Sequence, residues 1–216
     1  MEFSIDPQIQ GGLALTMLEF INHDECPALW QEKLTPLLAQ IAAHDDLATL
    51  RADPAIQATK AAYKAVGKDP SRYRPSSDSL WRRVINHKGL YHVNALVDLN
   101  NALSLQLHLP IGSYDQAQLT PPLRYTVAEA GASYPGIGKA AIDLSQGLVL
   151  ADAKGYFGSP TADSNRAMIT GNTRQALMVV YLFGACDPEA IQQLVANQAQ
   201  HYLDQAQVLQ QAVIWP

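Results

Sequence analysis

The chain has 216 residues, of which 48% are hydrophobic and 16% are charged, and its net charge is −5. This length and composition suffice for a substantial buried core and argue against a disordered chain. No apolar run approaches the ~20 residues that a membrane span needs, and Glu2 and Asp6 replace the basic start of a signal peptide. We therefore expect a soluble, cytoplasmic protein without a membrane partner.

The charge is distributed unevenly along the chain. The segment from Lys60 to Lys88 holds eight basic residues and two acidic ones, so it carries +6 while the rest of the chain carries −11. Such asymmetry suits a protein that meets a polyanion such as RNA with one face only. A solvated helix face explains it equally well, and the sequence leaves both explanations open.

The two cysteines, Cys26 and Cys186, lie in no metal-binding or redox motif. We expect them to be small buried side chains, and we expect no disulfide, no metal site and no cofactor.

Four segments carry helix signals. Apolar residues at three- and four-residue spacing mark the first, and Asp53 and Asp187, each followed by proline, cap the second and the fourth. The expected helices cover residues 29–41, 54–67 and 76–89, and a stretch that begins at residue 188.

Short β-prone runs lie between these helices, at Arg124–Val127 and Gly147–Ala151. No repeat or flexible linker divides the chain. The sequence therefore predicts one mixed α and β (α+β) domain over residues 1–216, with a helical N-terminal portion at 1–50 and helices flanking central β-structure. Thr170 is expected to cap one further helix, which contains Leu177, Val180 and Tyr181.

A polar stripe accompanies the apolar stripe of another expected helix, which starts at about Val97. Asn94, Asp98 and Asn101 follow at four- and three-residue steps on one face. Asn and Asp are poor residues for a helix interior, so their clustering has two explanations. Asp98 is either a helix cap or, with Asn101, part of a polar pocket wall.

Three stretches around this helix carry a known pattern, namely GLYHVN at 89–94, VDLNNAL at 97–103 and LPIGSYD at 109–115. They resemble GI-x-P-x-N, VDVTNYVM and QPxHAFD of the B3/B4 editing region of the phenylalanyl-tRNA synthetase beta subunit. Further likeness occurs at 69–77, at the Gly136-Ile137-Gly138 turn, at 150–152 and at Asp163-Ser164. The resemblance extends roughly over residues 54–183, and it is closest to free-standing proteins built from this region.

The resemblance implies an editing fold and a free-standing, trans-acting aminoacyl-tRNA deacylase. Such an enzyme hydrolyses the ester of a mischarged or non-protein amino acid on tRNA with a positioned water, without metal or organic cofactor. Its partners are the aminoacylated 3′ end of tRNA and the attached amino acid. A non-catalytic module that binds tRNA or an amino acid with the same fold is the alternative.

Candidate site residues follow from the resemblance together with the polar stripe. Asp98 and Asn101 are the expected catalytic residues. Candidates for substrate binding are Ser76, Ser77, Asn94, Gly112, Ser113, Tyr114, Gly136, Gly138, Asp163 and Ser164. Candidates for tRNA contact are Arg72, Tyr73, Arg74, Arg82 and Arg83, and unpaired bases can stack on Tyr73, Tyr91 or Tyr114. His87, His92 and His108 have no partner at a convincing spacing, so no histidine is expected to be catalytic.

One position departs from the family pattern. Gly112 stands where the QPxHAFD turn has its histidine, so the resemblance does not carry over specificity for tyrosine. We expect either that the space at Gly112 admits another side chain or that Ser113 and Tyr114 supply replacement hydrogen bonds.

Overall fold

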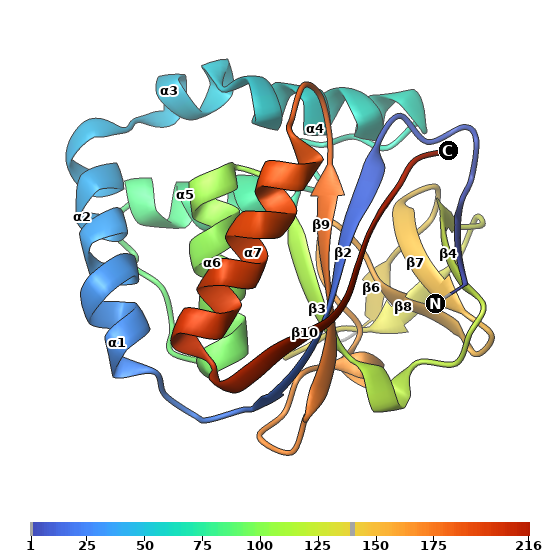
Figure 1. Cartoon of the computed structure of the whole chain (residues 1–216). Helices are drawn as coiled ribbons and strands as arrows, with labels where there is room; N and C mark the ends of the chain where they lie inside the picture. Colours follow the sequence, from blue (N-terminus) through green and yellow to red (C-terminus); the bar gives the residue numbers. More distant parts are fainter. Residues whose placement is uncertain (1, 139–140) are drawn as a thin grey trace.

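The computed structural model describes residues 2–138 and 141–216 as three layers: helices, a first sheet and a second sheet (Figure 1). The first sheet, here called the long sheet, is antiparallel with the order β10-β2-β9-β3. Its strands are Asp204–Ile214, Gly12–Ile21, Gln175–Leu182 and Ile111–Asp115 in that order.

The second sheet, here called the short sheet, has the order β1-β4-β7-β8, and only its β1–β4 pair is parallel. Its strands are Phe3–Ile5, Leu123–Val127, Leu148–Asp152 and Gly155–Gly158. A small hairpin joins β5 (Ser133–Pro135) to β6 (Ala141–Asp143). The expected strands in the middle of the chain are thus confirmed as β4 and β7.

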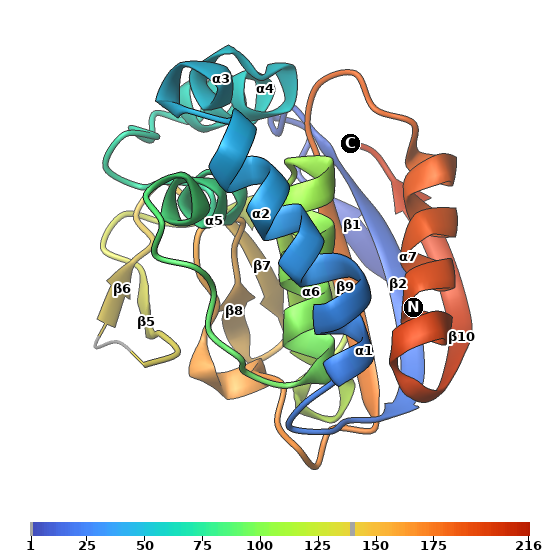
Figure 2. The same cartoon turned by 90° about the vertical axis from the view of Figure 1, so that its left-hand side faces the viewer.

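Helices α6 and α7 cover the face of the long sheet that points away from the short sheet, and α1 and α5 pack against α6 (Figures 1 and 2). The helices are α1 Pro27–Leu29, α2 Thr35–His44, α3 Leu47–Ala52, α4 Pro54–Ala65, α5 Ser76–Ile85, α6 Ala95–Leu107 and α7 Pro188–Tyr202. A π-helical turn, Trp30–Leu34, links α1 to α2. In the described part of the chain, no helix has the length and apolarity to cross a membrane.

The predicted caps at Asp53 and Asp187 are confirmed. Asp53 Oδ1 accepts a hydrogen bond from Ile56 N at 2.9 Å, and Asp187 Oδ1 accepts from two amides at the start of α7. The helix expected over 76–89 ends earlier, at Ile85, because His87 adopts a left-handed backbone conformation with φ 55°. That conformation does not continue a right-handed helix.

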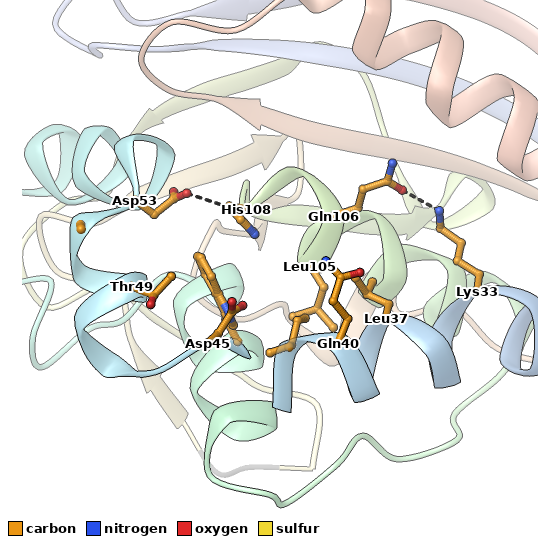
Figure 3. A pocket seen from close by; sticks show the side chains of 12 residues that line it. Lys33, Leu37, Gln40, Asp45, Thr49, Asp53, Leu105, Gln106 and His108 are labelled. Carbon is orange, nitrogen blue, oxygen red and sulfur yellow. Dashed lines mark hydrogen bonds and ion pairs between the residues drawn. The ribbon is translucent and has the colours of Figure 1, made fainter. Parts of the chain in front are cut away.

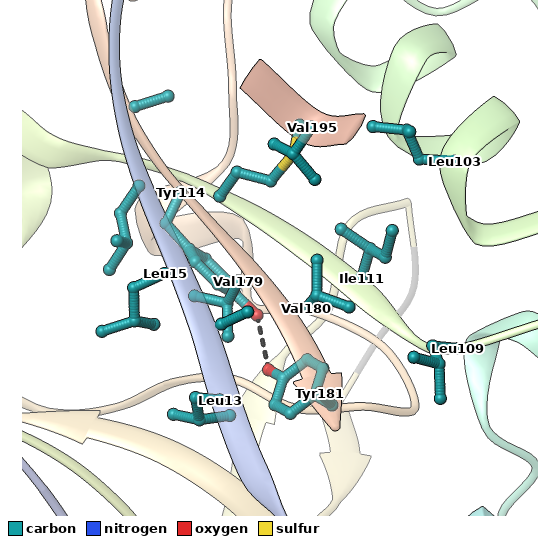
Figure 4. Close-up of a cluster of buried hydrophobic side chains, with 14 of the residues drawn as sticks. Leu13, Leu15, Leu103, Leu109, Ile111, Tyr114, Val179, Val180, Tyr181 and Val195 are labelled. Atoms are coloured by element: carbon teal, nitrogen blue, oxygen red, sulfur yellow. Dashed lines mark hydrogen bonds between the residues drawn. The ribbon is translucent and has the colours of Figure 1, made fainter. Parts of the chain in front are cut away.

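The helix expected after Thr170 is wrong, since residues 175–182 form strand β9. Seven of its eight residues are buried, because α-helices cover one face of this central strand and the short sheet covers the other. A fully buried run of this length has no alternation, so periodicity does not distinguish a strand from a buried helix. The buried cluster around β9 contains Val179, Val180 and Tyr181 (Figure 4).

The first amides of α6 all have hydrogen-bond acceptors within the protein, so none of them is free for a ligand. Asn94 caps the helix by accepting from Val97 N at 3.0 Å, while Ala95 N and Leu96 N donate to His23 O and Asn22 Oδ1. The cap is therefore Asn94, and the prediction of a cap at Asp98 is corrected.

Asp98 ties three segments together from a fully buried position. Its Oδ2 accepts from Trp30 Nε1 at 2.7 Å, and its Oδ1 accepts from Val93 N at 3.0 Å. Burial raises the pKa of this carboxyl, although both hydrogen bonds favour its ionised form. The side chain thus holds α6 against the π-helical turn that contains Trp30 and against the loop that precedes α6.

We expect Asp98→Ala to lower the free energy of unfolding by about 1–3 kcal/mol, because it leaves the Trp30 and Val93 donors without their partner. The matched control is Asn101→Ala, three residues along the same helix at a partly exposed position, with an expected change of about 0.5 kcal/mol or less. Urea unfolding of both variants measures the difference. Equal destabilisation by the two substitutions would contradict the role of the Asp98 hydrogen bonds in holding α6 to its neighbouring segments.

Tyr114 lies between the two sheets, where two glycines make room for its ring. A Cβ atom added to Gly112 would lie 2.2 Å from Tyr114 Oη, and one added to Gly158 would lie 2.3 Å from the same oxygen. The ring also meets Phe157 edge to face, with 4.9 Å between centroids. The expected space at Gly112 for a different side chain is therefore absent, since Tyr114 fills it.

Gly112→Ala should destabilise the fold by about 1–3 kcal/mol, because the added methyl overlaps the fully buried Tyr114 ring. In a Tyr114→Ala background the same substitution should cost much less, since the overlapping ring is gone. Denaturant unfolding of the two single variants and the double variant gives this coupling. Additive effects would show that the two residues do not share the space.

Candidate functional site

The long sheet separates the predicted site residues into two groups. On β3, alternate side chains point to opposite faces. Ser113 faces the helices, where its hydroxyl donates to Asn100 Oδ1 of α6 at 2.9 Å. Gly112 and Tyr114 face the short sheet. The polar stripe of α6 and the Tyr114 side chain therefore lie on opposite faces of the sheet and do not form one pocket.

The second group contains a cluster of one carboxyl and two hydroxyl groups, here called the inter-sheet cluster: Asp163, Tyr114 and Tyr181. Tyr114 Oη donates to Asp163 Oδ1 at 2.8 Å. The same oxygen lies 2.9 Å from Tyr181 Oη (Figure 4). The two tyrosines are fully buried, whereas Asp163 keeps part of its surface accessible. The cluster thus leads from the interior between the sheets to the surface.

Asp163 is the titratable centre of this cluster. Burial raises the pKa of its carboxyl to about 6, although hydrogen bonds from Tyr114 and from Ser159 N favour the ionised form. Both of those bonds go to Oδ1, and within residues 2–138 and 141–216 none is found to Oδ2. A carboxyl with such a pKa and one uncommitted oxygen is suited to accept a proton near neutral pH.

The loop that carries Asp163, residues 159–163, is fixed by contacts from distant elements. Tyr63 Oη of α4 lies 2.7 Å from Thr161 Oγ1, and Tyr134 Oη of β5 donates to Ala162 O at 2.5 Å. Ser76 N, at the start of α5, donates to Pro160 O at 2.8 Å. The inter-sheet cluster therefore sits where α4, α5, β5 and both sheets meet.

Other predicted substrate residues surround this loop. Gly136 forms an isolated β-bridge with Ser164, and the Ser164 hydroxyl accepts from Arg166 N. Gly138 is exposed with φ +63°, next to residues 139 and 140, which lie outside the described residues. Ser77 is buried, and its hydroxyl has no hydrogen-bond partner in the part of the chain that the structure describes.

The predicted RNA-contacting residues fall into engaged and exposed groups. Arg82 pairs with the buried carboxylate of Asp78, which also binds Lys60 Nζ at 2.7 Å. Arg72 and Arg74 are exposed on the segment that leads into α5. The positive segment thus offers fewer available cations than its sequence suggests, because Lys60 and Arg82 are both paired with Asp78.

Tyr73 is also in contact with other residues of the protein. Its hydroxyl donates to Asp143 Oδ2 at 2.6 Å, and Lys68 Nζ lies 3.7 Å from the ring centroid. The hydrogen bond from Tyr73 is the largest cause that holds the pKa of Asp143 well below its usual range. Tyr73 therefore joins the basic segment to the β5–β6 hairpin.

A groove that the sequence did not indicate lies between α2, α3, α5 and α6 and has a volume of about 690 Å³ (Figure 3). On its wall, His108 Nδ1 lies 2.8 Å from Asp53 Oδ2, and its ring stacks on Trp81 with 3.8 Å between centroids. Trp81 Nε1 donates to Asp45 Oδ2 at 2.8 Å. His108 has no partner at short spacing because Asp53 lies 55 residues away.

Both cysteines are free and only partly buried, which corrects the expectation of full burial. Among the described residues, no group of three or more His, Cys, Asp or Glu side chains is arranged to hold a metal ion.

Comparison with known proteins gives a family match and a similar solved structure. The family model B3/4 domain matches residues 58–203. An N-terminal fragment of the phenylalanyl-tRNA synthetase beta-subunit from Pyrococcus horikoshii, solved by crystallography, is similar at 15% identity with a TM-score of 0.46. The match covers 93% of this chain and 47% of the fragment, so the chain spans about half of its length. No curated protein matches the chain. Since the family model covers well over half of the sequence, the chain belongs to the B3/4 domain family.

Proposed function

We propose that the protein is a trans-acting aminoacyl-tRNA deacylase, which hydrolyses the ester of a mischarged or non-protein amino acid on tRNA. Membership of the B3/4 domain family supports a domain related to tRNA synthetases. The observation that carries the deacylase proposal is Asp163, a carboxyl with a pKa of about 6 and an uncommitted oxygen at the end of the inter-sheet cluster.

The proposed chemistry needs no protein nucleophile, because an aminoacyl ester is already activated. Asp163 Oδ2 accepts a proton from a bound water, whose oxygen attacks the ester carbonyl carbon. The bond between that carbon and the ribose oxygen then breaks, and the ribose oxygen takes up the proton. The products are free amino acid and tRNA.

Tyr114 is a positioning residue in this proposal. Its hydroxyl fixes Asp163 Oδ1, and Tyr181 in turn lies within hydrogen-bonding distance of that hydroxyl. The orientation of the carboxyl is thus set from the protein interior, which leaves Oδ2 as the oxygen that meets water.

The other candidates take roles according to their exposure. Arg72 and Arg74 are proposed to contact tRNA phosphates, because both are exposed on the segment that leads into α5. Asp98 is proposed to position α6 relative to Trp30 and Val93, since both its oxygens accept hydrogen bonds from these residues inside the protein. Asn101 is partly exposed on the other side of the long sheet from Asp163, so it has no contact with the ester in this mechanism.

A non-catalytic module that binds tRNA or an amino acid is the second candidate. The observation in its favour is the Tyr114 ring, which fills the space beside Gly112 where the family pattern has a histidine. An assay of the purified protein against a panel of correctly and wrongly charged tRNAs separates the two. RNA binding without any hydrolysis would refute the deacylase and leave the binding module.

Asp163→Asn should lower the rate of hydrolysis of the best substrate at least about 100-fold, in the range typical for loss of a general base. The amide keeps an oxygen that accepts from Tyr114, so binding of uncharged tRNA should not change. Release of labelled amino acid and a separate binding assay measure the two quantities. A variant that retains wild-type turnover would exclude Asp163 as the base.

The rate should also depend on pH, because only the ionised carboxylate accepts a proton. Since burial raises the pKa of Asp163 to about 6, the ionised fraction and the rate should rise from pH 5 to pH 7. Asp163→Asn should abolish this rise once spontaneous ester hydrolysis in buffer is subtracted. A wild-type rate that stays constant over this range would contradict the assignment.

A further inference from the structure

The loop between α5 and α6, residues 86–94, carries an exposed aromatic side chain, and its backbone can be followed between these two helices in Figure 2. Tyr91 is 71% exposed and Val93 is 53% exposed. Exposure of single apolar side chains is common, so the case for a partner depends on how this ring is held and on what surrounds it.

The loop is held at both ends, which keeps the ring in place without a ligand. Near its start, Arg83 Nε donates to Gly89 O at 2.6 Å and Arg83 Nη2 donates to Lys88 O at 3.2 Å. At its other end, Val93 N donates to Asp98 Oδ1 at 3.0 Å. A ring that is ordered before binding loses little conformational entropy when a ligand stacks on it.

Stacking between His92 and Trp30 fixes the loop in the middle as well. The two rings lie 3.8 Å apart between centroids, with an angle of 19° between their planes. His92 follows Tyr91 directly, so this stack anchors the backbone on which the exposed ring stands.

The charge around Tyr91 is positive. The Arg83 guanidinium carbon lies 4.2 Å from the centre of the Tyr91 ring, and Lys88 is exposed in the same loop. Arg83 thus covers one face of the ring and leaves the rest of it open. An exposed ring beside cations is the arrangement with which proteins bind single-stranded nucleic acid, since bases stack on the ring and phosphates meet the cations.

The other two tyrosines expected to stack on bases are less suited. Tyr114 is fully buried between the sheets, and Tyr73 is bonded to Asp143 with a lysine against its ring. Of the three candidates, Tyr91 alone presents most of its surface.

We infer that Tyr91, Arg83 and Lys88 form a stacking platform for an unpaired base of single-stranded RNA. The identification of that RNA with the 3′ end of tRNA rests on the proposed function, whereas the platform itself does not require hydrolysis.

The test measures binding of a short single-stranded oligoribonucleotide by fluorescence anisotropy. Tyr91→Ala should weaken binding about tenfold, as expected for the loss of one base stacked on an aromatic ring. Tyr91→Phe should bind like the wild type, because it keeps the ring and loses only the hydroxyl. Trp215→Ala is the matched control, since it removes another exposed aromatic side chain, near the C-terminus, and should leave binding unchanged.

Equal affinity of Tyr91→Ala and the wild type would overturn the platform and assign the exposed ring to a protein contact instead. Equal losses in Tyr91→Ala and Trp215→Ala would overturn it too, because binding would then not depend on this loop. The proposed deacylase activity can be refuted independently of the platform. Loss of RNA binding in Tyr91→Ala with no hydrolysis by the wild type supports the platform and refutes the deacylase.

Discussion

The fold depends on the packing of the two sheets against each other. At their contact, two glycines leave room for the side chain of one tyrosine. Gly112 of β3 and Gly158 of β8 admit the Tyr114 ring between the layers, and the ring brings a hydroxyl to the end of the loop that carries Asp163. Tyr114, which fills the core, also orients a carboxyl that is suited to proton transfer.

Much of the fold could be predicted from local signals. Asp53 and Asp187 mark the starts of α4 and α7, because a cap and a following proline act over only a few residues. β9 could not be predicted, since its character as a strand comes from layers that cover both of its faces. The same limit applies to the long-range pairs, such as Asp53 with His108, which no local spacing reveals.

The candidate site was predictable in its parts but not in its arrangement. Asp163 and Tyr114 were both expected near the substrate, but the sequence does not show that Tyr114 fills the space beside Gly112. The polar stripe of α6 was recognised, yet the sheet places it on the opposite side from the inter-sheet cluster. The charge of the basic segment was also an incomplete guide, because the buried carboxylate of Asp78 engages both Lys60 and Arg82.

The two ends of α6 repeat one arrangement, in which an indole donates to an aspartate and stacks on a histidine. Trp30 has Asp98 and His92 at the first end, and Trp81 has Asp45 and His108 at the last. The chain has three tryptophans, and the third, Trp215, is exposed near the C-terminus. Intrinsic fluorescence of single-tryptophan variants would therefore report separately on the two ends of one helix, the first beside the Tyr91 loop and the last in the groove.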